Sequence, residues 1–344
     1  MGEVGFVKLG KDVGIDLGTS SVLVYVLGKG IVLREPSIIS MHTKSKEVLA
    51  VGEEAKRMVG RTPGNIVTVQ PLMQGVITDI EVTEMMLRYF IRKSVGSMVL
   101  AKPRVLLCVP AAVTSVERRA VLQAGLAAGA GSVYLIEESL AAALGAGLNI
   151  RPPRGHMIVD IGGGTTDIAV LSLNDIVTSA TTRVGGNAFD EQIIKYIRRE
   201  HRLLIGQSTA EEVKIAIGSA HPESTEEKEY EVRGRDALTG LPKSVLVRSS
   251  DIRGAISEPL EVIGMTVRRV LDQTPPELIC DIIDRGVVLT GGGALLTGID
   301  AYLRDITGLS VHVAEDPISC VAKGTCVALE NFDLYKEHMN RLSK

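Results

Sequence analysis

The sequence predicts an α/β fold built from two similar domains, and three observations support it. The chain has 344 residues, which suits two domains at roughly 100–200 residues each. Strand-like and helix-like stretches alternate along the chain, as they do in α/β proteins. The third observation is an internal repeat, in which residues 14–25 and 159–170 share one pattern.

The repeat predicts the same hairpin at the start of each domain. In each copy an apolar strand ends in an aspartate, Asp16 or Asp160. A turn rich in Gly, Thr and Ser then leads into a second strand of alternating character. The two aspartates are separated by about one domain length. We therefore interpret the chain as two related domains in tandem.

Further elements of the first domain follow from apolar spacing and capping residues. Arg104–Val109 is an apolar run that predicts a buried strand. Thr114 and Glu117 have the spacing of a capping box, which predicts that a helix begins there. Another helix is predicted by apolar residues on one face: Val82, Met85, Met86, Tyr89 and Phe90.

The second domain continues with helices, an exposed sheet and a strand. Apolar spacing predicts a helix around residues 189–197, and residues 224–247 alternate like an exposed β-meander. Residues 250–273 predict one long helix that ends before Pro275. Residues 287–289 predict a strand that runs into three glycines.

Two connections set the expected domain boundaries, one at residues 149–155 and one near Pro317. The first domain is expected at residues 1–149 plus 318–344, and the second at residues 150–317, with a peripheral subdomain at about 185–250. A last helix, from about Ile318 to about Leu342, would pack back on the first domain.

Composition excludes several classes of function. The net charge is −3 and only 3% of residues are aromatic, which argues against nucleic-acid binding. The four cysteines have no metal-binding spacing, and no secretory signal is recognised, which favours the reducing cytoplasm. No apolar run approaches the roughly 18 residues that a membrane span needs.

Three glycine-rich turns follow predicted strands, at residues 18–20, 162–165 and 291–293. Glycine lets the backbone approach a phosphate, and consecutive N–H groups bind anions. Tight turns also need glycine, so a single turn would say little. Three such turns, two of them in an internal repeat, favour phosphate binding.

Asp16 and Asp160 stand beside two of these turns. Mg²⁺ prefers one or two carboxylates together with water and phosphate oxygens, so a magnesium site is predicted there. The alternative is that each carboxylate caps its own turn. The chain lacks the P-loop pattern and the dinucleotide fingerprint, which excludes those two nucleotide-binding classes.

Five motifs together resemble the superfamily of actin, heat-shock chaperones and sugar kinases: GIDLGTSS, LIEESLAAALG, VDIGGGTTDIAVL, EEVK and VVLTGGGALL. More closely, the chain resembles the bacterial actin family of MreB and Mbl over nearly its whole length. The resemblance implies an actin-like ATPase fold, with two ribonuclease H-like domains around a nucleotide cleft and a smaller subdomain in each. It also implies ATP and ADP as ligands, together with Mg²⁺.

The resemblance assigns roles to individual residues. Phosphate contacts are implied for Thr19, Ser20, Ser21, Gly163, Gly164 and Thr165. Contacts to the rest of the nucleotide are implied for Glu211, Glu212, Val213, Lys214, Gly292, Gly293, Ala294 and Leu295. Catalytic roles are implied for Glu138, Asp160 and Thr166, and Asp16 and Asp160 would hold Mg²⁺ through water.

Two of these residues have plain structural alternatives. Glu138 would orient the attacking water, but an acid in the first turn of a helix is also favoured by the helix dipole. Glu211 would contact adenosine, but Ser208 and Glu211 also have capping-box spacing. The chain departs from the family pattern at Ser21, where Asn is usual, and at Ser139, where Pro is usual. We expect these departures to tune hydrolysis while binding is retained.

The resemblance further implies filaments of this chain on the inner face of the cytoplasmic membrane. Met98, Val99 and Leu100 would form the membrane-binding loop, although such a loop can also cap a core. The implied role is to direct cell-wall elongation and rod shape, with RodZ, MreC and MreD as partners. The alternatives are a small-molecule kinase and a chaperone-like ATPase of the same superfamily.

Overall fold

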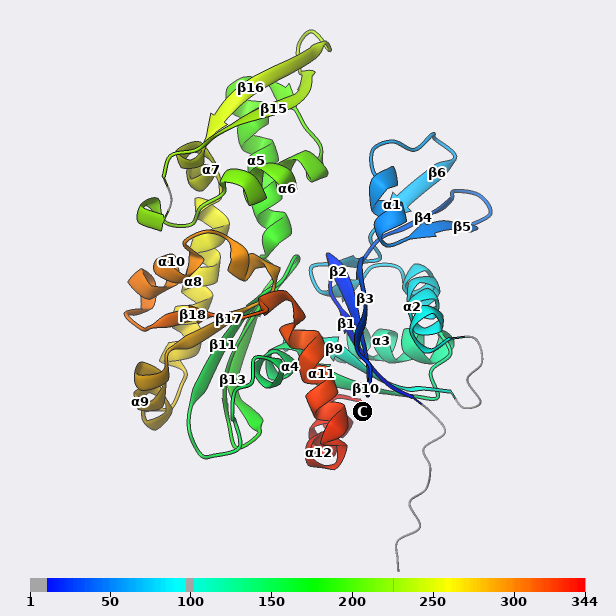
Figure 1. Cartoon of the computed structure of the whole chain (residues 1–344), viewed down its shortest axis with the longest axis vertical. Helices are drawn as coiled ribbons and strands as arrows, with labels where there is room; N and C mark the ends of the chain where they lie inside the picture. The colour runs from blue at the N-terminus through cyan, green and yellow to red at the C-terminus, as the bar shows by residue number, and fades with distance from the viewer. Residues whose placement is uncertain (1–10, 97–101, 225, 344) are drawn as a thin grey trace, which may run out of the picture. The chain divides into compact units, whose positions relative to one another are not determined.

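The computed structural model describes residues 11–96, 102–224 and 226–343. The chain divides into two compact units (Figure 1). Unit 1 consists of Met1–Gly147 and Val321–Lys344, and unit 2 is Leu148–Cys320. Each unit is built around its own five-stranded mixed sheet.

The sheet of unit 1 has the strand order β10-β9-β1-β2-β3. β1 and β2 form an antiparallel hairpin, whereas β9 runs parallel to β1 and to β10. Its strands are β1 (Asp12–Leu17), β2 (Ser21–Val26), β3 (Gly30–Pro36), β9 (Arg104–Val109) and β10 (Ser132–Glu137). The predicted strand at 104–109 is therefore confirmed as an inner strand of the sheet, where both faces are covered and an apolar run is expected.

Helices cover both faces of this sheet. Val13 and Ile15 belong to the same buried cluster as Met86 and Phe90. Gly14, between them in β1, faces Thr325 instead, because successive side chains alternate between the two faces of a strand. The helices are α2 (Ile80–Val95), α3 (Ser115–Ala127), α4 (Glu138–Gly145), α11 (Cys320–Glu330) and α12 (Phe332–Leu342).

Both helices predicted in this region form, and their caps are visible. The Thr114 hydroxyl accepts from the Glu117 N–H, and the Glu117 carboxylate accepts from the Thr114 N–H, which confirms the capping box of α3. Asp79 caps α2 by accepting from the Val82 N–H. Unit 1 also holds a small sheet, a helix and a hairpin: β4 (Ile39–His42), β5 (Val48–Val51), α1 (Glu53–Met58), β6 (Ile66–Val69), β7 (Leu72–Met73) and β8 (Val76–Ile77).

The sheet of unit 2 repeats the plan of unit 1. Its strand order is β13-β12-β11-β17-β18, with an antiparallel hairpin β11–β12 and with β17 parallel to β11 and to β18. The strands are β11 (His156–Ile161), β12 (Thr166–Ser172), β13 (Asp175–Thr182), β17 (Val287–Thr290) and β18 (Val311–Val313). The internal repeat thus corresponds to equivalent hairpins in two equivalent sheets.

The remaining elements of unit 2 are helices and a peripheral sheet. The helices are α5 (Gly186–His201), α6 (Gln207–Ile217), α7 (Ser249–Ala255), α8 (Ser257–Asp272), α9 (Pro276–Arg285) and α10 (Ile299–Thr307), with 3₁₀ turns η1 (Pro222–Ser224), η2 (Gly292–Leu295) and η3 (Pro317–Ser319). The peripheral sheet consists of β14 (Leu203–Leu204), β15 (Glu229–Asp236) and β16 (Pro242–Arg248).

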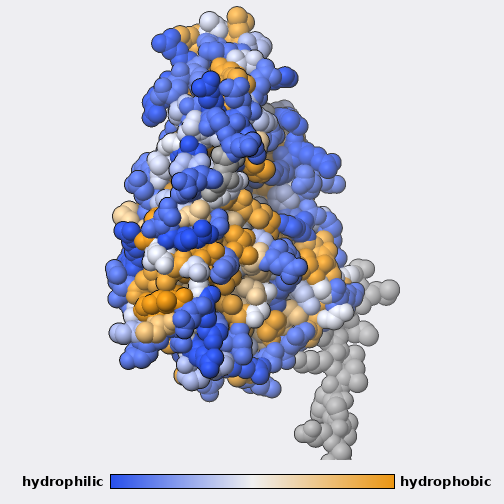
Figure 2. Space-filling model, turned by 60° about the vertical axis from the view of Figure 1, so that its left-hand side comes forward, coloured by the Kyte–Doolittle hydropathy of each residue, from blue (hydrophilic) through white to orange (hydrophobic). Residues whose placement is uncertain are grey.

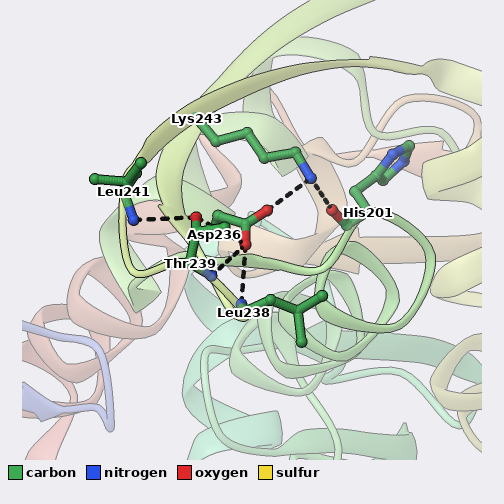
Figure 3. Close-up of polar contacts among 6 residues, drawn as sticks. All are labelled: His201, Asp236, Leu238, Thr239, Leu241 and Lys243. Carbon is green, nitrogen blue, oxygen red and sulfur yellow. Dashed lines mark hydrogen bonds and ion pairs between the residues drawn. The ribbon is translucent and has the colours of Figure 1, made fainter.

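The hairpin between β15 and β16 accounts for the alternating polar segment in the sequence. Asp236 fixes its turn: one carboxylate oxygen accepts from the N–H groups of Leu238 and Thr239, and the other lies 3.1 Å from Lys243 Nζ (Figure 3). The hydrophilic upper end of the molecule in Figure 2 is this peripheral region. Leu238 and Leu241 are exposed at the turn.

Two predicted long helices are each divided into two. Residues 250–273 form α7 and α8, which meet at Ile256. Pro259 explains the break, because its ring excludes the carbonyl of residue 255 and it has no N–H to donate. The last helix is divided at Asn331, whose side-chain amide donates to the Val327 carbonyl. Among the described residues, no helix is both long and apolar enough to cross a membrane.

Candidate functional site

The predicted site residues fall into two groups, one in each unit. Loop 1 (residues 18–21) joins β1 to β2 in unit 1, and Glu138 begins α4 in the same unit. Loop 2 (residues 162–165) joins β11 to β12 in unit 2, where turn 3 (residues 291–295) and α6 also lie. Met98, Val99 and Leu100 lie outside the described residues.

Loops 1 and 2 have the same backbone turn. The Gly18 N–H donates to the Ser21 carbonyl at 3.1 Å, and the Gly162 N–H donates to the Thr165 carbonyl at 2.9 Å. A Cβ on Gly18 would stand 2.8 Å from the Ser21 oxygen, so this turn requires glycine. The repeated sequence therefore encodes a repeated loop geometry.

Loop 2 is anchored by the beginning of α5. The Gly162 carbonyl accepts from the Gly186 N–H at 3.0 Å, and the Gly163 carbonyl accepts from the Asn187 N–H at 2.8 Å. In a trans peptide the carbonyl and the following N–H point in opposite directions. The N–H groups of Gly163 and Gly164 are therefore directed away from α5, as consecutive donors of an anion-binding nest.

In loop 1, a hydroxyl links the turn to a neighbouring hairpin. Thr19 is buried, and its oxygen accepts from the Gly75 N–H in the β7–β8 turn at 3.0 Å. A hydroxyl that accepts one hydrogen bond still has its own hydrogen to donate. The hydrogen bond from Gly75 thus holds the Thr19 side chain in place, and the Thr19 hydroxyl can donate its hydrogen to a phosphate oxygen.

A row of buried polar side chains crosses the sheet of unit 2 beside loop 2. Asp160 and Asp167 are cross-strand partners in β11 and β12. Thr290 donates to the Asp160 carboxylate at 2.7 Å, and Thr181 donates to the Asp167 carboxylate at 2.6 Å. Burial, with the nearby charge of Asp167, raises the pKa of Asp160 to about 7.

This row suits a hard cation that brings its own oxygen ligands. Among the residues described by the structure, no cluster of three or more His, Cys, Asp or Glu could hold a metal alone. Mg²⁺ does not need one, because it retains water and binds phosphate with one or two carboxylates. The negative charges of two neighbouring buried carboxylates repel each other, and a nearby cation offsets this repulsion. The residues present therefore fit Mg²⁺ accompanied by phosphate.

Turn 3 lies against the residue that precedes loop 2. A Cβ on Gly293 would stand 2.2 Å from the Ile161 side chain, and one on Gly291 would stand 2.3 Å from the Ile161 carbonyl oxygen. These glycines allow the end of β17 to pack directly beside β11. Turn 3 and loop 2 are therefore brought together, with Ala294 buried and Leu295 exposed.

Lys214 is held by a partner that sequence reasoning missed. Its ammonium lies 2.8 Å from the Asp190 carboxylate in α5 and donates to the Gly186 carbonyl at 3.0 Å. Asp190 interrupts the apolar spacing of the predicted 189–197 helix, which was the available signal. Burial raises the pKa of Asp190 to about 6, although the neighbouring Lys214 lowers it.

The capping interpretation of Glu211 is wrong. α6 begins at Gln207 after the N-cap residue Gly206, so Ser208 lies inside the helix and cannot be its cap. Val213 packs in the core of unit 2, so its side chain is not available to a ligand. Thr166 is buried and donates to the Val184 carbonyl at 2.8 Å, which fits a role in fixing the segment before α5.

Glu138 is the first residue of α4, and its side chain is 8% exposed. The rest of this short helix is rich in alanine and almost entirely buried. A carboxylate in the first turn of a helix is stabilised by the helix dipole. Such a group can orient a water molecule, which phosphoryl transfer needs more than a strong base.

Comparison with known proteins gives consistent results. Residues 10–337 match a family model described as MreB/Mbl protein. The chain is 53% identical over 323 residues to the cell shape-determining protein Mbl of Bacillus subtilis (strain 168), covering 94% of this chain and 97% of that protein. It is 51% identical over 329 residues to the cell shape-determining protein MreB of Escherichia coli (strain K12), covering 94% of each.

Solved structures agree with the sequence matches. The crystal structure of MreB 5 of Spiroplasma citri bound to AMPPNP has a TM-score of 0.90 and 41% identity, covering 96% of this chain and 98% of that one. The ADP-bound crystal structure of the same protein has a TM-score of 0.89. A double helical filament of MamK has a TM-score of 0.79 at 23% identity, which shows the fold alone. The predicted actin-like α/β fold is confirmed.

Proposed function

The chain belongs to the MreB/Mbl family of cell shape-determining proteins, and from this premise we propose that it binds and hydrolyses ATP and assembles into filaments. The observation that carries the proposal is the matched pair of loops 1 and 2. Each follows a buried strand that ends near an aspartate, and each has the same glycine-dependent turn. Nests of backbone N–H groups of this kind bind phosphate.

Phosphate is bound in our proposal by Thr19, Ser20 and Ser21 of loop 1 and by Gly163, Gly164 and Thr165 of loop 2. The remaining nucleotide contacts come from Glu211, Lys214 and turn 3. The position of Lys214, fixed by Asp190 and by the Gly186 carbonyl, supports this assignment because α5 also anchors loop 2. The Spiroplasma citri relative is bound to AMPPNP in one structure and to ADP in another, which supports nucleotide binding by this chain.

Hydrolysis is assigned to Glu138, which orients the attacking water, with Asp160 beside the phosphate loop. Asp16 and Asp160 would hold Mg²⁺ through water. When bound, Mg²⁺ neutralises negative charge on the phosphates and so assists transfer to water. Thr166 acts indirectly, by holding Val184 and hence the segment that leads into α5.

Membrane attachment is proposed for the filament on the inner face of the cytoplasmic membrane. Met98, Val99 and Leu100 are the proposed contact, and each would contribute roughly 1.5–3 kcal/mol at full burial. One monomer would bind weakly, whereas a filament multiplies the contacts. RodZ, MreC and MreD are the proposed partners in cell-wall elongation.

The test combines electron microscopy with phosphate release. We expect filaments on anionic lipid monolayers with Mg-ATP and none without nucleotide. Glu138→Gln should lower the hydrolysis rate by about 10²-fold or more while nucleotide binding is retained. The matched control is Glu277→Gln, since Glu277 is also an acid in the first turn of a helix. Equal rates for Glu138→Gln and the unmodified chain would contradict the catalytic assignment.

A further inference from the structure

The residue before Glu138 is held by the C-terminal helix. Glu137 is the N-cap residue of α4, yet its side chain makes no cap hydrogen bond to that helix. Its carboxylate is instead hydrogen-bonded to Nε2 of His338 in α12. Both side chains are largely buried. The start of the helix that carries Glu138 is therefore fastened to a segment 201 residues further along the chain.

A third residue contacts the other nitrogen of the His338 ring. Arg341 Nη2 lies 3.3 Å from His338 Nδ1. A guanidinium group can only donate, so Nδ1 accepts from Arg341 and Nε2 carries the ring N–H. Nε2 then donates to the Glu137 carboxylate. The directed chain of hydrogen bonds therefore runs from Arg341 through His338 to the carboxylate of Glu137, the residue before Glu138.

α12 is fastened to β10 at a second point. The ring of Phe332 packs edge-on against Tyr134 at 5.0 Å, and the Arg104 guanidinium lies 4.0 Å from the centre of the Phe332 ring. Phe332 and His338 are six residues apart in a helix, which is about 9 Å. Tyr134 and Glu137 are three residues apart in a strand, which is about 10 Å. The two contacts match in spacing, so the helix is fastened along the strand at both.

The preceding helix also contacts α4. A Cβ on Gly324 in α11 would stand 1.7 Å from the Ala141 carbonyl oxygen, so the backbones of α11 and α4 are in direct contact. Only Asn331 separates α11 from α12. Ser139 leaves the start of α4 without a proline ring that would restrict its backbone. The contacts from α11 and α12 supply that restriction instead.

We propose that α12, through His338, holds Glu137 and so sets the orientation of Glu138 for ATP hydrolysis. His338 is a positioning residue in this scheme and does not touch the nucleotide. The inference rests on the proposed function, since it concerns the same hydrolysis. In this proposal Glu137 positions Glu138, and the rate of hydrolysis depends on the contact between Glu137 and α12.

The test compares His338→Ala with His338→Gln in the full chain. Gln keeps a side-chain N–H near the position of Nε2, whereas Ala removes it. We expect His338→Ala to lower the single-turnover hydrolysis rate about tenfold with unchanged ATP affinity, because small misplacements of a catalytic group are costly. His338→Gln should recover most of the rate. Glu337→Gln, at the exposed neighbouring position, is the matched control.

A second readout is independent of activity. Amide hydrogen exchange in residues 138–144 should be faster in His338→Ala than in the unmodified chain and normal in His338→Gln. If His338→Ala does not fold, Arg341→Ala alters an exposed side chain and should give a smaller change in the same direction.

The outcomes separate the two proposals. An unmodified chain that does not hydrolyse ATP would contradict the proposed function, and hydrogen exchange would still decide whether His338 holds α4. Hydrolysis that depends on Glu138 but is equal in His338→Ala and the unmodified chain would overturn the positioning role alone. Equal losses in His338→Ala and His338→Gln would overturn it as well.

Discussion

The ammonium group of Lys214 in α6 lies 2.8 Å from the carboxylate of Asp190 in α5, and Asp190 is almost completely buried. The same ammonium donates to the Gly186 carbonyl, while the Gly186 N–H donates to the Gly162 carbonyl of loop 2. One continuous set of polar contacts thus joins the proposed adenosine contact to the proposed phosphate loop.

Asp190 should make stability depend on pH in a defined direction. Burial raises its pKa from 3.8 to about 6 in the folded protein. Between these values the folded chain holds a proton that the unfolded chain has lost, so stability falls as pH rises through this window. Asp190→Asn lacks that proton. The unmodified chain therefore loses stability over this pH range, whereas the variant does not. We expect the difference in unfolding free energy, variant minus unmodified chain, to increase by on the order of 2 kcal/mol between about pH 4.5 and 7.5.

Urea unfolding of nucleotide-free protein at several pH values measures this difference. Asp300→Asn serves as the control, because Asp300 is only partly buried and pairs with Arg304 one helical turn away. A difference that stays constant with pH would show that Asp190 does not titrate in this range.

Gly185→Ala should damage loop 2 and weaken nucleotide binding. A Cβ at this position would stand 2.5 Å from the Gly162 oxygen and 2.8 Å from the Gly163 oxygen. Because both are backbone atoms, loop 2 would have to move, and we expect about a tenfold loss of ATP affinity, or about 1.4 kcal/mol. A fluorescent ATP analogue reports the affinity. Gly206→Ala, at the N-cap of α6 with nothing within 4 Å, should bind normally.

Gly14→Ala should destabilise unit 1. The added Cβ would stand 1.8 Å from Thr325 Oγ1, and Thr325 is fully buried. Overpacking of this kind costs about 1–3 kcal/mol, which thermal or denaturant unfolding would detect. Gly64→Ala meets nothing within 4 Å and should leave the transition unchanged. A normal transition for Gly14→Ala would mean that α11 can shift without loss.

Asp236→Ala should loosen the exposed β15–β16 turn without affecting the core. The two backbone N–H groups that donate to the Asp236 carboxylate hold the pKa of this group far below its usual range (Figure 3). The hydrogen bonds that the Asp236 carboxylate accepts should therefore persist down to about pH 4 and be lost only in stronger acid. We expect faster amide exchange at Leu238 and Thr239 in the variant, with an unchanged unfolding midpoint.

Glu231→Ala is the control for this turn, because Glu231 forms an exposed pair with Arg233 on the same strand. Unchanged exchange in Asp236→Ala would show that two backbone hydrogen bonds hold the turn alone. These are Asp236 N–H to the Leu241 carbonyl and Gly240 N–H to the Asp236 carbonyl.

The fold was largely predictable because its main signals are local. The repeated hairpins, the buried strand Arg104–Val109 and the capping box at Thr114 each depend on a few neighbouring residues. The two divided helices do not follow from local signals, because apolar spacing continues across Ile256 and Asn331 while the helical backbone does not. The capping-box spacing of Ser208 and Glu211 is misleading because α6 already begins at Gln207, after the N-cap residue Gly206.

The candidate site was less predictable because its supporting contacts are made across strands and helices. Thr290 and Asp160 are neighbours only through the pairing of β17 with β11. Asp190 and Lys214 belong to separate helices. His338 is joined to Glu137 from the far end of the sequence. No local pattern encodes these partners, since each depends on the register of a completed sheet or on helix packing.

The contact between Gly14 and Thr325 has a consequence for biosynthesis. The first strand of unit 1 is covered by a helix, α11, that follows nearly all of unit 2 in the sequence. Unit 2 is continuous in sequence, so all of it has been translated before that helix is available. Domains fold as units during synthesis. We therefore expect the second unit to fold first, while one face of the first unit's sheet stays uncovered until α11 has been translated.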